Sequence, residues 1–154
     1  AYSNTWYPYS FVAPEGHNQP FLDKALEVIK GLYDSILESG IAAKDIHLAG
    51  FSQGACLASE FAARYATGLG SLHIYSGGLI GQELLTQRYQ ADLTGTKVLI
   101  GCSDVDAHIP LERVHQTTVQ LKGQGAEVDE RIYPNAPHSV FEDELEASRK
   151  ILGA

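Results

Sequence analysis

The stretch HLAGFSQGACLASEFAARYA, residues 47–66, places a serine at position 52 with a glycine two positions away on each side. After Ser52, alanines and larger apolar residues recur with helical spacing, so a short strand is predicted to turn into a helix here. A sharp strand-to-helix turn presents a serine hydroxyl to a base and a substrate, and Gly50 and Gly54 would remove side chains that clash. The alternative is that Ser52 is an ordinary N-cap in a plain turn. The five residues from Gly50 to Gly54 leave both interpretations open.

The composition is that of a globular protein, with 44% hydrophobic and 19% charged residues among 154. A net charge of −8 and the lack of any Lys/Arg-rich run argue against nucleic acid as a partner. The apolar runs are too short for stable membrane insertion, and no signal peptide is recognisable at the N-terminus. Cys56 and Cys102 have no metal-site spacing and are too few for a disulfide framework. We therefore expect free thiols and a cytoplasmic location.

The periodicity predicts an α/β fold in one domain, residues 1–154. Strands and helices alternate from Asp45 onward, which predicts a mostly parallel sheet with helices on both faces, in three α/β/α layers. The predicted strands are 45–50, 71–78, 96–102 and 126–134, and the predicted helices are 21–40, 53–65, 82–90, 111–125 and 139–152. In such sheets ligands bind at the carboxyl ends of the strands. The loops that follow three of these strands should therefore meet near Ser52.

A serine nucleophile needs a base, usually an imidazole, and the imidazole needs an acid to orient it. Four of the six histidines are expected to be structural or solvated: His17 in a loop, His47 and His73 in strands, and His115 in a helix. His108 and His138 remain, and His138 lies in the proline-bracketed loop of YPNAPHSVFEDE, at the correct edge of the sheet. The alternative is that His138 is a surface residue that caps a helix.

The loop GCSDVDAHIP, residues 101–110, carries Asp104, Asp106 and His108 in alternation. One interpretation is a solvated turn. Another is a metal site, because Asp and His both bind cations, although no second cluster with ligand spacing supports it. The third is that one aspartate orients His138. The chain order is then Ser, Asp, His, as in α/β-hydrolases.

With these residues in view, the chain resembles the phospholipase/carboxylesterase family of α/β-hydrolases, which includes acyl-protein thioesterases. The matching segments are GFSQGA (50–55), SGGLIG (76–81), DVDAHIPLERV (104–114) and YPNAPHSVFEDEL (133–145). The resemblance implies hydrolysis of carboxylic esters or thioesters, without a cofactor or metal, through an acyl-enzyme intermediate. By position it implies Ser52 as nucleophile, His138 as base and Asp106 as acid, since the family aspartate stands four residues before the proline. Asp104 is then expected to shape the loop.

The chain departs from the family at its N-terminus. The resemblance implies an opening strand and a His-Gly loop that gives one N–H to the oxyanion hole, with the second N–H from the residue after the nucleophile, here Gln53. No such loop precedes Ser52. We expect the natural protein to be longer. The alternatives are a second subunit that covers the gap, or decay to a non-catalytic role.

Aromatic residues crowd the N-terminal segment: Tyr2, Trp6, Tyr7, Tyr9 and Phe11. They are predicted either to line an acyl pocket or to cover the sheet edge as core, and Trp6 is the best candidate for substrate contact. The favoured substrate is a small-molecule ester of short or medium chain. A non-catalytic binding or oligomeric protein on the same fold is the main alternative, since fold alone does not settle function, and homo-oligomerisation stays open. A metal-dependent hydrolase that uses Asp104, Asp106 and His108 is a third reading.

Overall fold

The computed structural model describes residues 4–14 and 16–153. Its helices and strands are α1 (Phe21–Glu38), β1 (His47–Phe51), α2 (Gln53–Tyr65), β2 (Ser71–Tyr75), β3 (Lys97–Ser103), α3 (Leu111–Gly123), β4 (Glu127–Tyr133) and α4 (Glu142–Leu152), with short 3₁₀ turns at Ala43–Asp45 and Thr86–Arg88. Tyr2 lies outside the described residues. Within the described part of the chain, no helix is long and apolar enough to cross a membrane.

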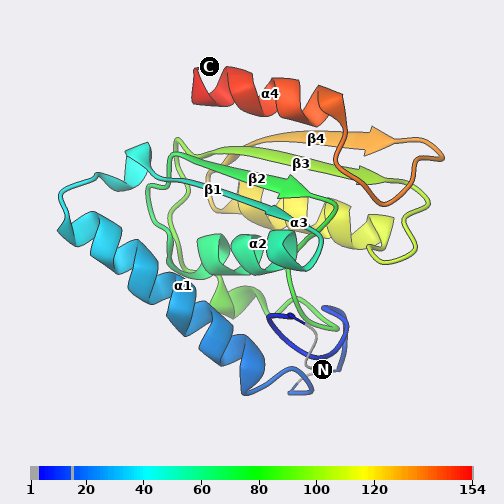
Figure 1. The fold of residues 1–154 in the computed structure, drawn as a ribbon, viewed down its shortest axis with the longest axis horizontal. Coiled ribbons are helices and arrows are strands. Elements are labelled where there is room, and N and C mark those ends of the chain that lie inside the picture. Colours follow the sequence, from blue (N-terminus) through cyan, green and yellow to red (C-terminus); the bar gives the residue numbers. More distant parts are fainter. Residues whose placement is uncertain (1–3, 15, 154) are drawn as a thin grey trace.

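The four strands form one parallel sheet in the order β1-β2-β3-β4. Helix α4 covers one face, α2 and α3 cover the other, and α1 packs outside α2 (Figure 1). The expected α/β architecture, with parallel strands and helices on both faces, is confirmed. All four strands therefore end at the same edge of the sheet, where their arrowheads point in Figure 1.

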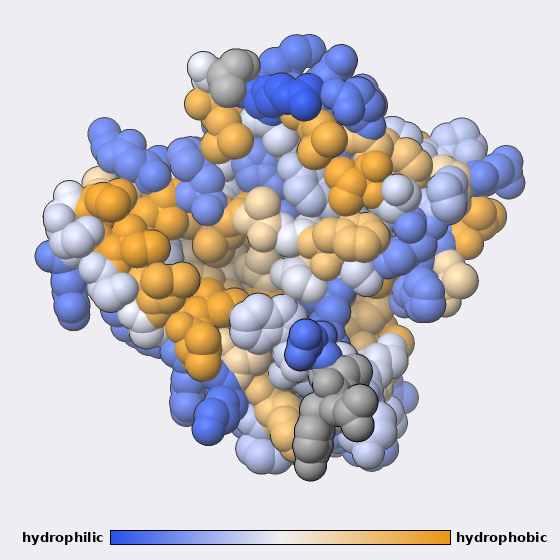
Figure 2. Space-filling model, in the orientation of Figure 1, coloured by the Kyte–Doolittle hydropathy of each residue, from blue (hydrophilic) through white to orange (hydrophobic). Residues whose placement is uncertain are grey.

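The core lies between the two central strands and the helices. β2 and β3 are almost wholly buried, as expected for parallel strands covered on both faces. Helix α2 approaches the sheet closely because its inward positions are small, and these alanines are all buried: Ala55, Ala58, Ala62 and Ala63. Apolar side chains also gather on the surface along α1, where Phe21, Val28 and Leu32 are exposed (Figure 2).

The prediction of a helix over residues 82–90 is wrong. Only Thr86–Arg88 form a single 3₁₀ turn there. The buried guanidinium of Arg113 on α3 donates hydrogen bonds to the carbonyl oxygens of Leu79, Gly81 and Gln82. Carbonyls at the start of a helix would instead accept from N–H groups four residues later. Of the three carbonyls that Arg113 binds, only that of Gln82 belongs to the predicted helix.

Candidate active site

Ser52 stands at a strained turn between β1 and α2. Its φ of 53° and ψ of −120° lie in a region that non-glycine residues rarely adopt, and such strain is typical of functional sites. A Cβ at Gly50 would collide with the backbone of Gly54 and Ala55, so the chain can turn this tightly only with glycine at position 50. The prediction that a side chain at position 54 would clash is wrong. A Cβ at Gly54 meets no atom within 4 Å outside its own helix, and it is the Gly54 backbone that Gly50 approaches.

The structure brings together the three side chains that the sequence singled out. Nε2 of His138, on the loop after β4, lies 2.9 Å from Oγ of Ser52. Nδ1 of His138 lies 2.6 Å from Oδ2 of Asp106, on the loop after β3. A carboxylate accepts only, so Nδ1 carries the proton, and Nε2 is free to accept from the serine hydroxyl. The three carboxyl-terminal loops thus converge in one Ser-His-Asp chain of hydrogen bonds.

Asp106 is held in its charged form. Its side chain is fully buried, which alone would raise its pKa. Hydrogen bonds from His138 and from the backbone N–H groups of His108 and Ile109 outweigh burial and lower the pKa below its usual value. The thiol of Cys102 also donates to Oδ2 at 3.7 Å. The buried carboxylate can therefore stabilise a positive charge on the imidazole.

Two aromatic side chains confine the imidazole of His138. The rings of Phe51 and His138 have centroids 4.9 Å apart, and those of His108 and His138 are 5.0 Å apart. Sequence reasoning missed Phe51 and Cys102, although each directly neighbours a predicted site element in the chain. Their contacts depend on loops that meet only in the fold.

Asp104 does not contact His138. Its Oδ1 accepts a hydrogen bond from the backbone N–H of Asn135 at 2.8 Å, and its own N–H donates to the carbonyl oxygen of Tyr133. These bonds join the loop after β3 to the loop that carries His138. Asp104 and Asp106 thus face different partners, and the described residues contain no cluster of three or more His, Cys, Asp or Glu side chains arranged to hold a metal ion.

A cavity of about 180 Å³ adjoins the serine. Its lining combines aromatic, polar and thiol groups: Tyr7, Tyr9, Ser10, Phe11, Ser52, Gln53, Cys56, His108 and Ile109. Among the predicted aromatics, Tyr7 and Phe11 are largely buried core residues that also reach this cavity, and Tyr9 lies at the surface. The N-terminal segment therefore both packs as core and lines the hollow beside Ser52.

Trp6 is about half exposed and is not among the lining residues of this cavity. Its backbone N–H donates to Oε1 of Gln53, whose Nε2 donates in turn to the carbonyl oxygen of Tyr7. The Gln53 side chain thus fastens the N-terminal segment to the start of α2, beside Ser52. The role of Trp6 in substrate contact stays a prediction.

A larger hollow, of about 540 Å³, lies between residues 82–86 and α3, and none of Ser52, Asp106 or His138 lines it. Most lining groups are surface polar side chains, and the buried guanidinium of Arg113 is already bonded to backbone carbonyls. Size alone does not identify a site. The smaller cavity is the candidate because Ser52 lines it.

Sequence comparison identifies the family of the chain. The family profile described as Phospholipase/Carboxylesterase matches residues 2–154. A probable carboxylesterase of Oryza sativa subsp. japonica is 27% identical over 122 residues, which cover 79% of this chain and 46% of that protein. Lysophospholipase-like protein 1 of Mus musculus is 27% identical over 148 residues, which cover 94% and 61%. The chain spans about half the length of the curated relatives it matches.

Structural comparison agrees. The crystal structure of a phospholipase/carboxylesterase from Dyadobacter fermentans DSM 18053 superposes with a TM-score of 0.93 at 40% identity, covering 97% of this chain and 71% of that one. Arabidopsis thaliana SOBER1 has a TM-score of 0.79 at 18% identity, covering 97% and 72%, and this likeness shows the fold alone. The parallel sheet, the helix layers and the matched profile lead to one conclusion: the chain belongs to the phospholipase/carboxylesterase family of α/β-hydrolases.

Proposed function

We propose that this protein hydrolyses carboxylic esters or thioesters, with Ser52 as nucleophile, His138 as general base and Asp106 as the acid that orients His138. The observation that carries the proposal is the continuous hydrogen-bonded chain from Ser52 Oγ through both ring nitrogens of His138 to Asp106. The names of the relatives support the same class of reaction. A serine alcohol is a weak nucleophile until a base removes its proton, and His138 stands within reach of that proton.

The reaction proceeds in two halves. Ser52 Oγ attacks the acyl carbon while Nε2 of His138 takes the hydroxyl proton, and the intermediate collapses as His138 returns that proton to the leaving alcohol or thiol. Water then attacks the acyl-enzyme and gives a proton to Nε2. His138 passes this proton to Ser52 Oγ as the carboxylic acid leaves. Asp106 stabilises the imidazolium in both halves without accepting the proton itself.

The tetrahedral oxyanion needs hydrogen-bond donors. We assign one of them to the backbone N–H of Gln53, because Gln53 is the first residue of α2 and directly follows Ser52. The first N–H groups of a helix have no partner within the helix, and they lie at the positive end of its dipole, which favours a negative charge.

The substrate we favour is a small-molecule ester or thioester with a short or medium acyl chain. The hollow beside Ser52 is small and is lined by both aromatic and polar groups, which suits a compact acyl group. Trp6 is proposed to contact the rest of the substrate, outside this hollow. Cys56 and Cys102 are buried free thiols, as in a protein that works in a reducing compartment, and this supports a cytoplasmic location.

The test is hydrolysis of p-nitrophenyl butyrate by the full-length protein, with and without prior treatment by a fluorophosphonate. We expect turnover that fluorophosphonate abolishes and that a chelator leaves unchanged. Activity lost to the chelator but not to fluorophosphonate would assign a metal mechanism. No hydrolysis of any ester or thioester across a short-to-medium chain series would favour a non-catalytic role.

A further inference from the structure

The loop that carries His138 is held by hydrogen bonds along its length. At its start, Asp104 accepts from the N–H of Asn135. Directly after His138, the hydroxyl of Ser76 donates to the carbonyl oxygen of Ser139 at 3.0 Å. At its end, the N–H of Phe141 donates to Oε2 of Glu144 at 2.7 Å, and the N–H of Glu144 donates back to the carbonyl oxygen of Phe141. The last of these anchors is the most unusual.

Glu144 is a carboxyl group placed in the core. It lies in the first turn of α4, on the side that faces β3, and none of its surface is exposed. Gly101 of β3 makes room for it, because a Cβ at that position would collide with the Glu144 carboxyl. Oε1 is buried and has no hydrogen-bond partner among the described residues. Burial accordingly raises the pKa of Glu144 to about 7.

The bond from the Phe141 N–H to Glu144 joins the N-cap of α4 to its third residue, which is one half of a capping box, but such a bond does not require the carboxyl to be buried. Glu142 and Asp143 already bring negative charge to the first turn from exposed positions, where it favours the helix dipole at no desolvation cost. Burying a carboxyl with one hydrogen bond is unfavourable. What Glu144 does that its neighbours do not is to fix the backbone of Phe141, three residues after His138.

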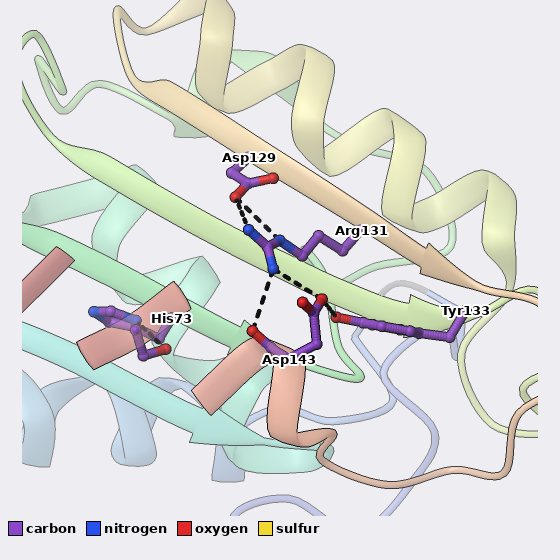
Figure 3. Close-up of polar contacts among 6 residues, drawn as sticks. His73, Asp129, Arg131, Tyr133 and Asp143 are labelled. Carbon is purple, nitrogen blue, oxygen red and sulfur yellow. Dashed lines mark hydrogen bonds and ion pairs between the residues drawn. The ribbon is translucent and has the colours of Figure 1, made fainter. Parts of the chain in front are cut away.

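The outer side of the same turn is tied down as well. Arg131 and Tyr133 on β4 both bind the carboxylate of Asp143, and Arg131 also binds Asp129 (Figure 3). The ring of Tyr133 packs against that of Phe141, with centroids 4.3 Å apart. These contacts hold the start of α4 against β4, but at the surface. Glu144 is the inner contact, and it acts on the end of the loop itself.

We propose that Glu144 is a positioning residue for His138: from the buried face of α4, its carboxyl holds the Phe141 end of the loop so that the imidazole contacts Ser52 and Asp106 together. This rests on the proposed role of His138 as base. A displacement of about 1 Å in a reacting group can cost about 100-fold in rate. The loop ends three residues from the imidazole, so a freed Phe141 would loosen both contacts of His138.

The test compares variants of the full-length protein that differ in the hydrogen-bond acceptor. Glu144→Gln keeps a carbonyl oxygen for the Phe141 N–H at the same length. Glu144→Met has similar length and fills the core, but it offers no comparable acceptor. Glu142→Gln is the matched control, because it removes a charge from the same turn at an exposed position, where Glu142 pairs with Arg149. For each folded variant we would measure kcat and KM with p-nitrophenyl butyrate.

We expect Glu144→Met to lower kcat by about 10- to 100-fold with KM within twofold, and Glu144→Gln and Glu142→Gln to stay within threefold of the parent. A folded Glu144→Met protein with parental kcat would overturn the proposal and leave Glu144 as a helix cap. Should Glu144→Met not fold, Glu144→Gln decides: a loss beyond tenfold, with the acceptor retained, contradicts it.

A second readout does not depend on catalysis. The proton between His138 Nδ1 and Asp106 should give a downfield ¹H NMR signal, assigned by its loss in His138→Ala. We expect the signal to persist in Glu144→Gln and to broaden or vanish in Glu144→Met. An unchanged signal in folded Glu144→Met contradicts the positioning role even if the protein hydrolyses no ester. Failure of this inference is thereby separated from failure of the proposed function.

Discussion

Oγ of Ser52 lies 2.9 Å from Nε2 of His138, although 86 positions separate the two residues in the chain. The contact exists because β1 and β4 are parallel strands of one sheet and the loops after them meet at its carboxyl-terminal edge. Each of the four strands contributes there: Ser52 follows β1, Ser76 follows β2, Asp106 follows β3 and His138 follows β4. The fold thus assembles the site from four separate loops.

Asp106→Asn should reduce turnover far more than Asp104→Asn. Both changes remove one negative charge from the same loop, so long-range electrostatics change about equally. Only Asp106 holds the tautomer of His138, and loss of that role costs roughly 10⁴-fold in the serine protease precedent. Asp104→Asn weakens one bond to Asn135, at about 1 kcal/mol of stability. Turnover and thermal melting of both variants check this, and an inactive Asp104→Asn beside a normal Asp106→Asn would reassign the acid.

Ser52→Ala should abolish turnover and leave the fold intact. Among the described residues the Ser52 hydroxyl hydrogen-bonds to His138, and the strained backbone stays the same because alanine keeps the Cβ. We expect an unchanged circular dichroism spectrum and unfolding free energy within about 0.5 kcal/mol of the parent. Parental turnover in the purified variant would remove Ser52 from the mechanism.

Glu144 predicts a specific pH dependence of stability. The ordinary pKa of a glutamate, 4.5, describes the unfolded chain, whereas the pKa of Glu144 in the folded chain is about 7. The folded state therefore binds the proton more tightly than the unfolded state. The resulting stabilisation is complete below pH 4.5 and is lost as the pH rises to about 7, by up to ~3 kcal/mol. Glu144→Gln lacks this titration. Its unfolding free energy relative to the parent should therefore increase between pH 5 and pH 8.

Urea unfolding of parent and Glu144→Gln at both pH values measures that difference, and other titrating groups cancel in it. Asp106 acts in the opposite sense. Burial raises its pKa, but the bonds from His138 and the loop N–H groups more than offset this, so its stabilisation is lost as the pH falls. A difference between parent and variant that does not depend on pH would mean that Glu144 titrates near its ordinary value.

Arg113→Met should strongly destabilise the fold. The guanidinium donates to three carbonyls between Leu79 and Gln82, and its loss leaves buried acceptors unpaired, at about 3 kcal/mol or more. Arg149→Met is the control, since Arg149 makes an exposed ion pair with Glu142 that contributes little. Thermal melting compares them. Equal melting temperatures would show that residues 79–82 hold their path without Arg113.

Much of the fold followed from local pattern. The four strands and the helices around residues 21–38, 53–65 and 111–123 were predicted because their periodicity agrees with their burial. Errors arose where tertiary contacts decide the backbone. Arg113 binds the Gln82 carbonyl at the start of the helix predicted at 82–90, and Ser76, with φ of 50°, ends β2 earlier than expected. The last helix starts at Glu142 rather than at 139, because the Ser139 carbonyl accepts from Ser76 and Phe141 is an extended N-cap whose N–H donates to Glu144.

The site divides in the same way. Ser52 and His138 could be proposed from the motif and from their places after strands, whereas Asp106 was preferred to Asp104 only through the resemblance to the family. The groups that orient them could not. Phe51 packs against the imidazole, Cys102 donates to Asp106, and Glu144 accepts from the Phe141 backbone. Nothing in the sequence around these residues indicates such contacts. Their roles depend on distances that only the assembled sheet defines.

The central claim is that Ser52 is a nucleophile activated by His138. The most direct measurement is the mass-spectrometric mapping of the fluorophosphonate adduct on the full-length protein and on its His138→Ala variant. We predict one adduct per chain, on the peptide that contains Ser52, and labelling slowed at least about 100-fold in His138→Ala. An adduct on another residue, or labelling of Ser52 at the same rate without His138, would contradict the account.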